Sequence, residues 1–112
     1  MRVELLVVPD CPNEVAAHEV LAAAAALAEV VDLDVTVTVI DSDEEAQLRG
    51  FAGSPTFLIE GIDPFAVPGA PAGMACRLYP TAGGLSGTPD VFALREALLR
   101  EYAAPATSAD ER

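Results

Sequence analysis

The chain has 112 residues, of which 52% are hydrophobic, and its formal net charge at pH 7 is −12. A chain of this length forms one domain and buries roughly two-thirds of the surface that its unfolded form exposes. Its basic side chains are six arginines and no lysine, so its charge repels phosphate backbones and anionic lipid. We therefore expect no nucleic-acid partner and no membrane partner, and the sequence leaves the oligomeric state open.

The N-terminal segment enters the apolar run "VELLVV" at once, and this run is too short for a signal peptide or a membrane span. The lack of an export signal predicts a cytoplasmic protein. In a reducing cytosol, the two cysteines are expected as thiols or transient partners rather than as a structural disulfide.

The first part of the chain predicts a strand, a helix and a second strand. Residues 2–8 are rich in Val and Leu, as in a strand that is buried on both faces. From Pro12 to about Val31, apolar residues recur at spacings of three and four, which is typical of an amphipathic helix. Residues 33–40 alternate and are β-branched, so they predict a second strand.

A short helix is predicted next, in "DSDEEAQLRG". Ser42 and Glu45 match a capping box, and Gly50 is suited to end the helix. A third strand is expected over residues 56–60, and a loop rich in Gly, Pro and Ala over residues 61–75.

The last part of the chain predicts a short fourth strand at "CRLY" and an amphipathic helix after "TAGGLSGTPD". We expect one domain over residues 1–104 and a flexible acidic tail over residues 105–112. A strand–helix–strand start implies a parallel pair with a right-handed crossover. The fold class is therefore α/β, with a mixed four-stranded sheet and helices on both faces.

Two motifs lie at the junctions of this pattern. Cys11 directly follows the first strand, in "CPNE", and "GSPT", residues 53–56, directly precedes the third. Together with the order of elements, these motifs resemble the thioredoxin fold over about residues 1–103. The resemblance implies a strand order of 2-1-3-4, with strand four antiparallel. The combination of "CPN", "GFAGSPT", "DPF" and "CRLY" is also similar to a small bacterial thioredoxin-like group, some members of which are labelled alkylmercury lyase.

The resemblance also implies roles for single residues. Pro55 is expected to be cis and to lie beside the active thiol of Cys11, and Ser54 to offer its amide to a bound chain or thiol ligand. The expected substrate-binding residues are Pro12, Asn13, Ser54, Pro55, Thr56 and Arg77.

The chain departs from the thioredoxin pattern at Glu14, which stands where a thioredoxin has its second cysteine. Exchange between two thiols of one motif is therefore impossible. A helix N-terminus at Cys11 favours a thiolate, whereas Asp10 and Glu14 oppose it. The alternative is that Cys11 is a small buried hydrophobic residue.

Cys76 is the second candidate thiol. Hairpin geometry places it at the end of the sheet away from Cys11, but residues 61–75 are more than a hairpin needs. Their three prolines and three glycines suggest a defined lid that brings Cys76 or Arg77 toward Cys11. Arg77 would then offset Asp10 and Glu14. The alternative is a buried structural cysteine.

Two other polar residues are candidates for the site. His18 shares a helix face with Glu14 at a spacing of four and is expected to be solvated, because it is too far along the helix from Cys11 for a direct hydrogen bond. Asp63 belongs to a turn, "DPF", and would line the site only if the loop returns to it.

Three functions are consistent with these residues. The first is a thiol-disulfide oxidoreductase in which Cys11 attacks a disulfide and Cys76 or an external thiol resolves the intermediate, with no cofactor. Its partner would be a protein or small-molecule thiol or disulfide. The second is binding or detoxification of a soft metal, Cu(I) or Hg(II), by Cys11 and Cys76. A thiol-disulfide oxidoreductase, the first function, is expected to hold no metal. The third is a redox-inactive interaction module.

Overall fold

The computed structural model describes residues 1–110. In chain order the elements are β1 (Arg2–Val7), α1 (Glu14–Ala28), β2 (Asp34–Val39), α2 (Asp43–Arg49), β3 (Thr56–Ile59), β4 (Tyr79–Thr81), β5 (Gly84–Ser86) and α3 (Val91–Asp110). Among these residues, no helix combines the length and the apolar character that crossing a membrane requires. Helix α3 includes residues 105–110 of the predicted flexible tail, and residues 111–112 lie outside the described part.

The central sheet has the strand order β2-β1-β3. Strand β1 pairs in parallel with β2, from Arg2 opposite Asp34 to Val7 opposite Val39. On its other side β1 pairs with β3 in the antiparallel direction. The predicted parallel pair joined by a helix is therefore confirmed, and β1 is the central strand of the sheet.

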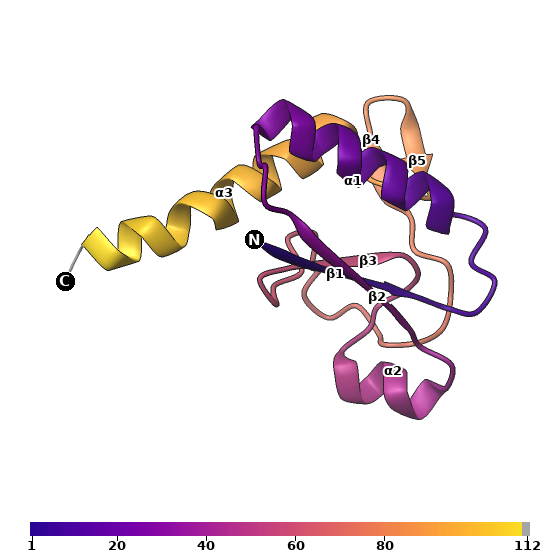
Figure 1. Cartoon of the computed structure of the whole chain (residues 1–112). Coiled ribbons are helices and arrows are strands. Elements are labelled where there is room, and N and C mark those ends of the chain that lie inside the picture. Colours follow the sequence, from indigo (N-terminus) through magenta and orange to yellow (C-terminus); the bar gives the residue numbers. More distant parts are fainter. Residues whose placement is uncertain (111–112) are drawn as a thin grey trace.

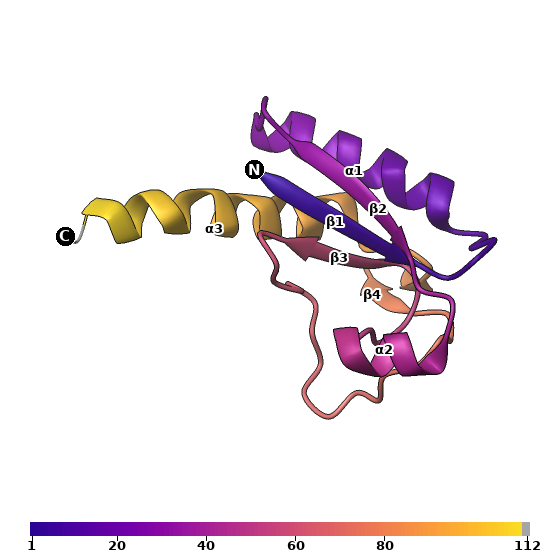
Figure 2. The same ribbon diagram turned by 60° about the horizontal axis from the view of Figure 1, so that its bottom comes forward.

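Helices cover both faces of the sheet, as predicted. Figures 1 and 2 show α1 and α3 together over one face and α2 under the other. Because successive side chains of a strand point to opposite faces, β1 contributes to two cores. Its side chains Val3, Leu5 and Val7 pack in the cluster that contains α1 and α3 residues. Leu6 packs on the opposite side with Ile40, Ala46 and Phe51.

The predicted fourth strand at "CRLY" is wrong in part. Within the described residues the sheet has three strands, and the chain from Tyr79 instead forms a separate β4–β5 hairpin. The preceding residues pair with Ser54, before the start of β3, through a parallel bridge between Ser54 and Cys76. Pro80 has no N–H to donate to a neighbouring strand, which disfavours the interior of a sheet for this segment.

Glu4 connects the sheet to α2. Its carboxylate accepts a hydrogen bond from the Thr38 hydroxyl at 2.6 Å and from the Arg49 guanidinium at 2.7 Å. The Thr38 hydrogen bond, and then Arg49, lower the pKa of Glu4 below its usual value, although partial burial opposes them. The ionised carboxylate therefore stabilises the fold above the pKa that Glu4 has in the unfolded chain, and this contribution is lost as the pH falls through its lowered pKa.

We predict that Glu4→Gln lowers the free energy of unfolding at pH 7 by up to about 1 kcal/mol, because the carboxylate is partly exposed to solvent. The difference from the parent protein should begin to shrink at the ordinary pKa of a Glu side chain, about 4.3, and disappear as the pH falls through the lowered pKa of Glu4. Urea denaturation at several pH values measures this, with Glu96→Gln as the control because Glu96 forms an exposed ion pair with Arg95. A Glu4→Gln difference that stays constant from pH 7 to pH 3 would contradict the assigned role.

Candidate functional site

Cys11 lies in the turn between β1 and α1. The Glu14 N–H donates to the Cys11 carbonyl at 3.3 Å, and Asn13 occupies the position before the helix without a side-chain cap bond. Helix α1 therefore begins at Glu14, after Pro12, which the sequence placed at the first helical position. The Cys11 side chain is partly buried and packs against the core that α1 and α3 cover.

The Cys11 sulfur receives a hydrogen bond from Ser54. The Ser54 hydroxyl lies 3.0 Å from Cys11 Sγ, and it accepts a bond from the Val8 N–H at 3.1 Å. Because a hydroxyl has one proton, the bond from Val8 leaves that proton free for the sulfur. Ser54 is fully buried, so the sequence motif "GSPT" supplies a fixed donor to the thiol.

The residues that follow Ser54 are held by loop contacts. The Ser54–Pro55 peptide bond is cis, as the resemblance implied. The Pro55 carbonyl accepts a hydrogen bond from the Tyr79 hydroxyl, whose pKa is raised by burial. Thr56 is buried, and its hydroxyl donates to the Gly53 carbonyl at 2.6 Å. These side chains stabilise the turn into β3.

The end of the long loop pairs with Ser54 through the main chain. The Ser54 N–H donates to the Ala75 carbonyl at 3.0 Å, and the Arg77 N–H donates to the Ser54 carbonyl at 2.9 Å. Gly53 allows this approach for two reasons: a Cβ added to it would lie only 2.9 Å from the Arg77 Cβ, and its backbone φ of +125° is one that other residues rarely adopt. The end of the loop therefore lies beside Ser54, and a lid that brings Cys76 toward Cys11 stays a prediction. The Ser54 amide, which was expected to be offered to a partner, is bonded to Ala75 instead.

Arg77 fastens the returning segment. Its guanidinium forms an ion pair with Asp63 at 2.8 Å and donates to the Phe65 carbonyl at 2.6 Å and the Thr56 hydroxyl at 3.1 Å. It also lies over the Tyr79 ring, 4.8 Å from the centroid. Arg77 is 8% exposed. We call Arg77, Asp63 and the Phe65 carbonyl the arginine clamp.

The clamp changes what the sequence suggested for Arg77. The guanidinium pairs with Asp63 of the loop rather than with Asp10 or Glu14, so it does not offset the acids beside Cys11. Asp63 pairs with Arg77 at the end of its own loop, and its place in the thiol site stays a prediction. No feature of the sequence pointed to the Tyr79 hydroxyl or the Phe65 carbonyl, because main-chain acceptors and buried hydroxyls leave no pattern in a sequence.

The two cysteines are both free thiols. Cys76 is exposed, which argues against a buried structural cysteine, and its backbone is paired with Ser54. A hollow of about 250 Å³ lies beside it, lined by Ala52, Val67, Ala70, Cys76, Arg77 and Leu78. Ser54 thus contacts both cysteine segments, one through its hydroxyl and one through its main chain.

His18 is about two-fifths exposed and lies 3.8 Å from Glu14, which agrees with a solvated histidine. Within residues 1–110, no group of three or more His, Cys, Asp or Glu side chains is arranged to hold a metal ion.

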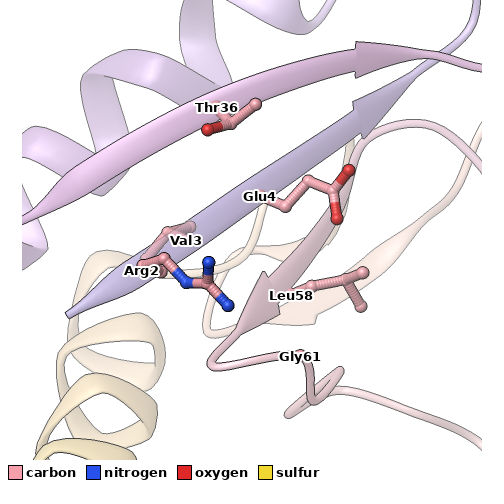
Figure 3. Close-up of a pocket in the computed structure, with 6 residues that line it drawn as sticks. All are labelled: Arg2, Val3, Glu4, Thr36, Leu58 and Gly61. Atoms are coloured by element: carbon pink, nitrogen blue, oxygen red, sulfur yellow. The ribbon is translucent and has the colours of Figure 1, made fainter.

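A second hollow, of about 270 Å³, lies on the sheet away from the thiols. Its lining residues are Arg2, Val3, Glu4, Thr36, Leu58 and Gly61. Figure 3 shows Arg2 and Glu4 projecting from one strand beside Leu58 of the next. Glu4 is already bound by Thr38 and Arg49, and no candidate site residue lines this hollow. The candidate thiol residues therefore lie around Ser54, away from this hollow.

Comparisons with protein-family models, with curated proteins and with solved structures found no match to this chain.

We predict that Ser54→Ala slows the alkylation of Cys11 by iodoacetamide at pH 7 by about threefold to tenfold. A hydrogen bond to a charged group contributes about 1.5–3 kcal/mol, and roughly half of such a stabilisation of the thiolate is offset by lower nucleophilicity. The rate is measured by mass spectrometry on Cys76→Ser protein, so that only Cys11 reacts. Ser54→Thr, which keeps a hydroxyl, is the matched control and should retain most of the rate. Equal rates in Ser54→Ala and the parent would show that the hydroxyl does not act on the sulfur.

Proposed function

We propose that this chain is a thioredoxin-like thiol protein that exchanges disulfides, with Cys11 as the attacking thiol and Cys76 or an external thiol as the resolving one. The strand–helix–strand start and the mixed β2-β1-β3 sheet are consistent with a thioredoxin-like fold. The observation that carries the proposal is the position of Ser54, which donates to Cys11 Sγ at 3.0 Å and pairs with Cys76.

Cys11 is the better candidate for the attacking thiol. Its sulfur has a fixed hydroxyl donor, and a negatively charged sulfur gains most from such a donor. Among the described residues, no side-chain hydrogen bond involves the Cys76 sulfur. Cys76 is the more exposed of the two, so it is accessible for a second step.

Reduction of a substrate disulfide needs only the thiols of Cys11 and Cys76. The Cys11 thiolate attacks one sulfur of a disulfide RS–SR′, forms Cys11–S–S–R and releases R′S⁻. The Cys76 thiol loses its proton to solvent, and its sulfur then attacks Cys11 Sγ and releases RS⁻. The substrate gains two electrons and the cysteine pair loses them. An external dithiol returns the Cys11–Cys76 disulfide to two thiols.

The bridge between Ser54 and Cys76 favours this second step. It brings the Cys76 backbone beside Ser54, whose hydroxyl donates to the Cys11 sulfur. A disulfide requires Cα atoms within about 4.4–6.8 Å, so formation of a Cys11–Cys76 disulfide in solution tests whether the two residues come within that distance.

We expect cystamine to oxidise the reduced protein with loss of two hydrogen atoms and release of two cysteamine molecules. Cys76→Ser should stop at the mixed disulfide with cysteamine, because the resolving thiol is gone. Cys11→Ser should react at least tenfold more slowly, because the hydroxyl-bonded sulfur is missing. Intact mass spectrometry under acid quench measures all three. If Cys11→Ser reacts as fast as the parent, Cys11 is not the attacking thiol.

A soft-metal site is the second candidate, because two free thiols border the same residue, Ser54. Two thiolates suffice for linear coordination of Hg(II) or Cu(I). We expect the reduced protein to bind one Hg(II) with the ultraviolet absorption of a dithiolate complex, and either Cys→Ser change to remove that absorption. Unchanged absorption in Cys76→Ser would exclude a site shared by the two cysteines.

A further inference from the structure

We propose that the segment Ala75–Arg77 closes the main-chain edge beside Cys11, so that disulfide substrates are recognised as small molecules, with no gain from pairing to an extended polypeptide. This inference rests on the proposed thiol exchange and adds to it the class of substrate. Three features of the structure support it. The main-chain groups of Ser54 are already hydrogen-bonded, the arginine clamp keeps them bonded, and the hollow beside Cys76 is small.

An extended peptide binds at the edge of a chain segment by pairing with its free N–H and C=O groups. Beside Cys11, the Ser54 N–H is bonded to Ala75 and the Ser54 carbonyl to the Arg77 N–H. The neighbouring carbonyls are also taken, since Gly53 accepts from Thr56 and Pro55 accepts from Tyr79. Pro55 has no N–H. The Ser54 N–H and the carbonyls of residues 53–55 are therefore not free to pair with a partner strand until residues 75–77 move away.

The arginine clamp opposes that movement. Arg77 follows Cys76 directly, and its guanidinium is bonded to Asp63, to the Phe65 carbonyl and to the Thr56 hydroxyl. Lifting the segment would separate a buried ion pair and leave an arginine that is 8% exposed without its partners. The contact with Ser54 is thus held by side chains as well as by two main-chain bonds.

The space around the thiols suits a small molecule. Cys76 is exposed, Cys11 is partly exposed, and the hollow beside Cys76 has a volume of about 250 Å³. Apolar side chains of Ala52, Val67, Ala70 and Leu78 contribute to its lining. Because Asp10 and Glu14 flank Cys11 and the chain has no lysine, a neutral or cationic disulfide is favoured over an anionic one.

A pair of substrates with the same disulfide tests the inference. One is the mixed disulfide of cysteamine with N-acetylcysteine amide. The other is the mixed disulfide of cysteamine with an acetylated, amidated heptapeptide of alanine and threonine that carries a central cysteine. Both have the same charge, so any difference in rate reports pairing with the peptide backbone. The rate of disulfide consumption is followed by chromatography at equal concentrations.

We expect the folded parent protein to consume the two substrates at rates within about threefold of each other. Arg77→Met and Asp63→Asn each loosen the clamp, so the ratio of peptide to short-substrate rate should rise about tenfold. Glu96→Gln, which removes a carboxylate from an exposed ion pair, is the control and should keep the parent ratio. Circular dichroism establishes that each variant is folded. Hydrogen exchange of the parent protein provides a second measurement that does not depend on the stability of the variants, and the Ser54 amide should be strongly protected.

Each contrary outcome identifies what is wrong. A parent protein that prefers the heptapeptide by tenfold or more, or a Ser54 amide that exchanges as fast as an unfolded one, would overturn the closure. An unchanged ratio in folded clamp variants would overturn the role of the clamp. A parent protein that consumes neither substrate would instead overturn the proposed thiol exchange, and the closure with it.

Discussion

Four hydrogen bonds at one buried residue, Ser54, connect the parts of the chain on which the site depends. Its hydroxyl accepts from Val8 at the end of β1 and donates to Cys11, and its main chain is bonded to Ala75 and Arg77. A buried polar group is costly unless it is paired. Since every polar atom of Ser54 has a partner, the residue fixes three segments that are far apart in the sequence. Any shift of the loop end would leave two of these bonds unmade.

The arginine clamp holds the end of the loop at Ser54. Among the arginines whose side chains are described, Arg77 is the one that is buried. Its ion pair with Asp63 is supported by hydrogen bonds to the Phe65 carbonyl and the Thr56 hydroxyl. Removing one partner of a buried pair costs about 3–5 kcal/mol, because the remaining charge is left without compensation. The planar guanidinium can reach all three acceptors at once, whereas a lysine would offer a single point charge. The loop is thereby tied to the start of β3.

The elements that the sequence predicted well are those with local causes. The parallel pair of β1 and β2 follows from two apolar runs joined by a helix. Helix α2 begins as expected, since the Ser42 hydroxyl accepts from the Glu45 N–H at 3.1 Å. It ends at Gly50, which has a left-handed φ of 62°. The ends of α2 are determined by residues within a few positions of one another, and each strand of the parallel pair carries its own local pattern, so these elements are visible in the sequence.

The residues that the sequence placed less well depend on distant contacts. "CRLY" has the alternation of a strand, and the structure keeps that alternation, with Arg77 and Tyr79 buried and Cys76 and Leu78 exposed. The alternation does not say which neighbour the segment pairs with. Here the inward side chains bind the loop and the turn before β3, so the backbone pairs with Ser54 rather than extending the sheet.

The same limit applies to the candidate site. The sequence identified Cys11 and the "GSPT" motif because both lie at predicted junctions, and it named the Ser54 amide as the group that meets a partner. It could not indicate that the amide is bonded within the chain, since a main-chain carbonyl such as that of Ala75 has no identity in the sequence. What separates an open binding edge from a closed one is therefore the side chain of Arg77, two residues beyond Ala75. If the proposed thiol exchange holds, the specificity of this site depends less on the residues that touch the sulfur than on an arginine that holds the neighbouring chain in place.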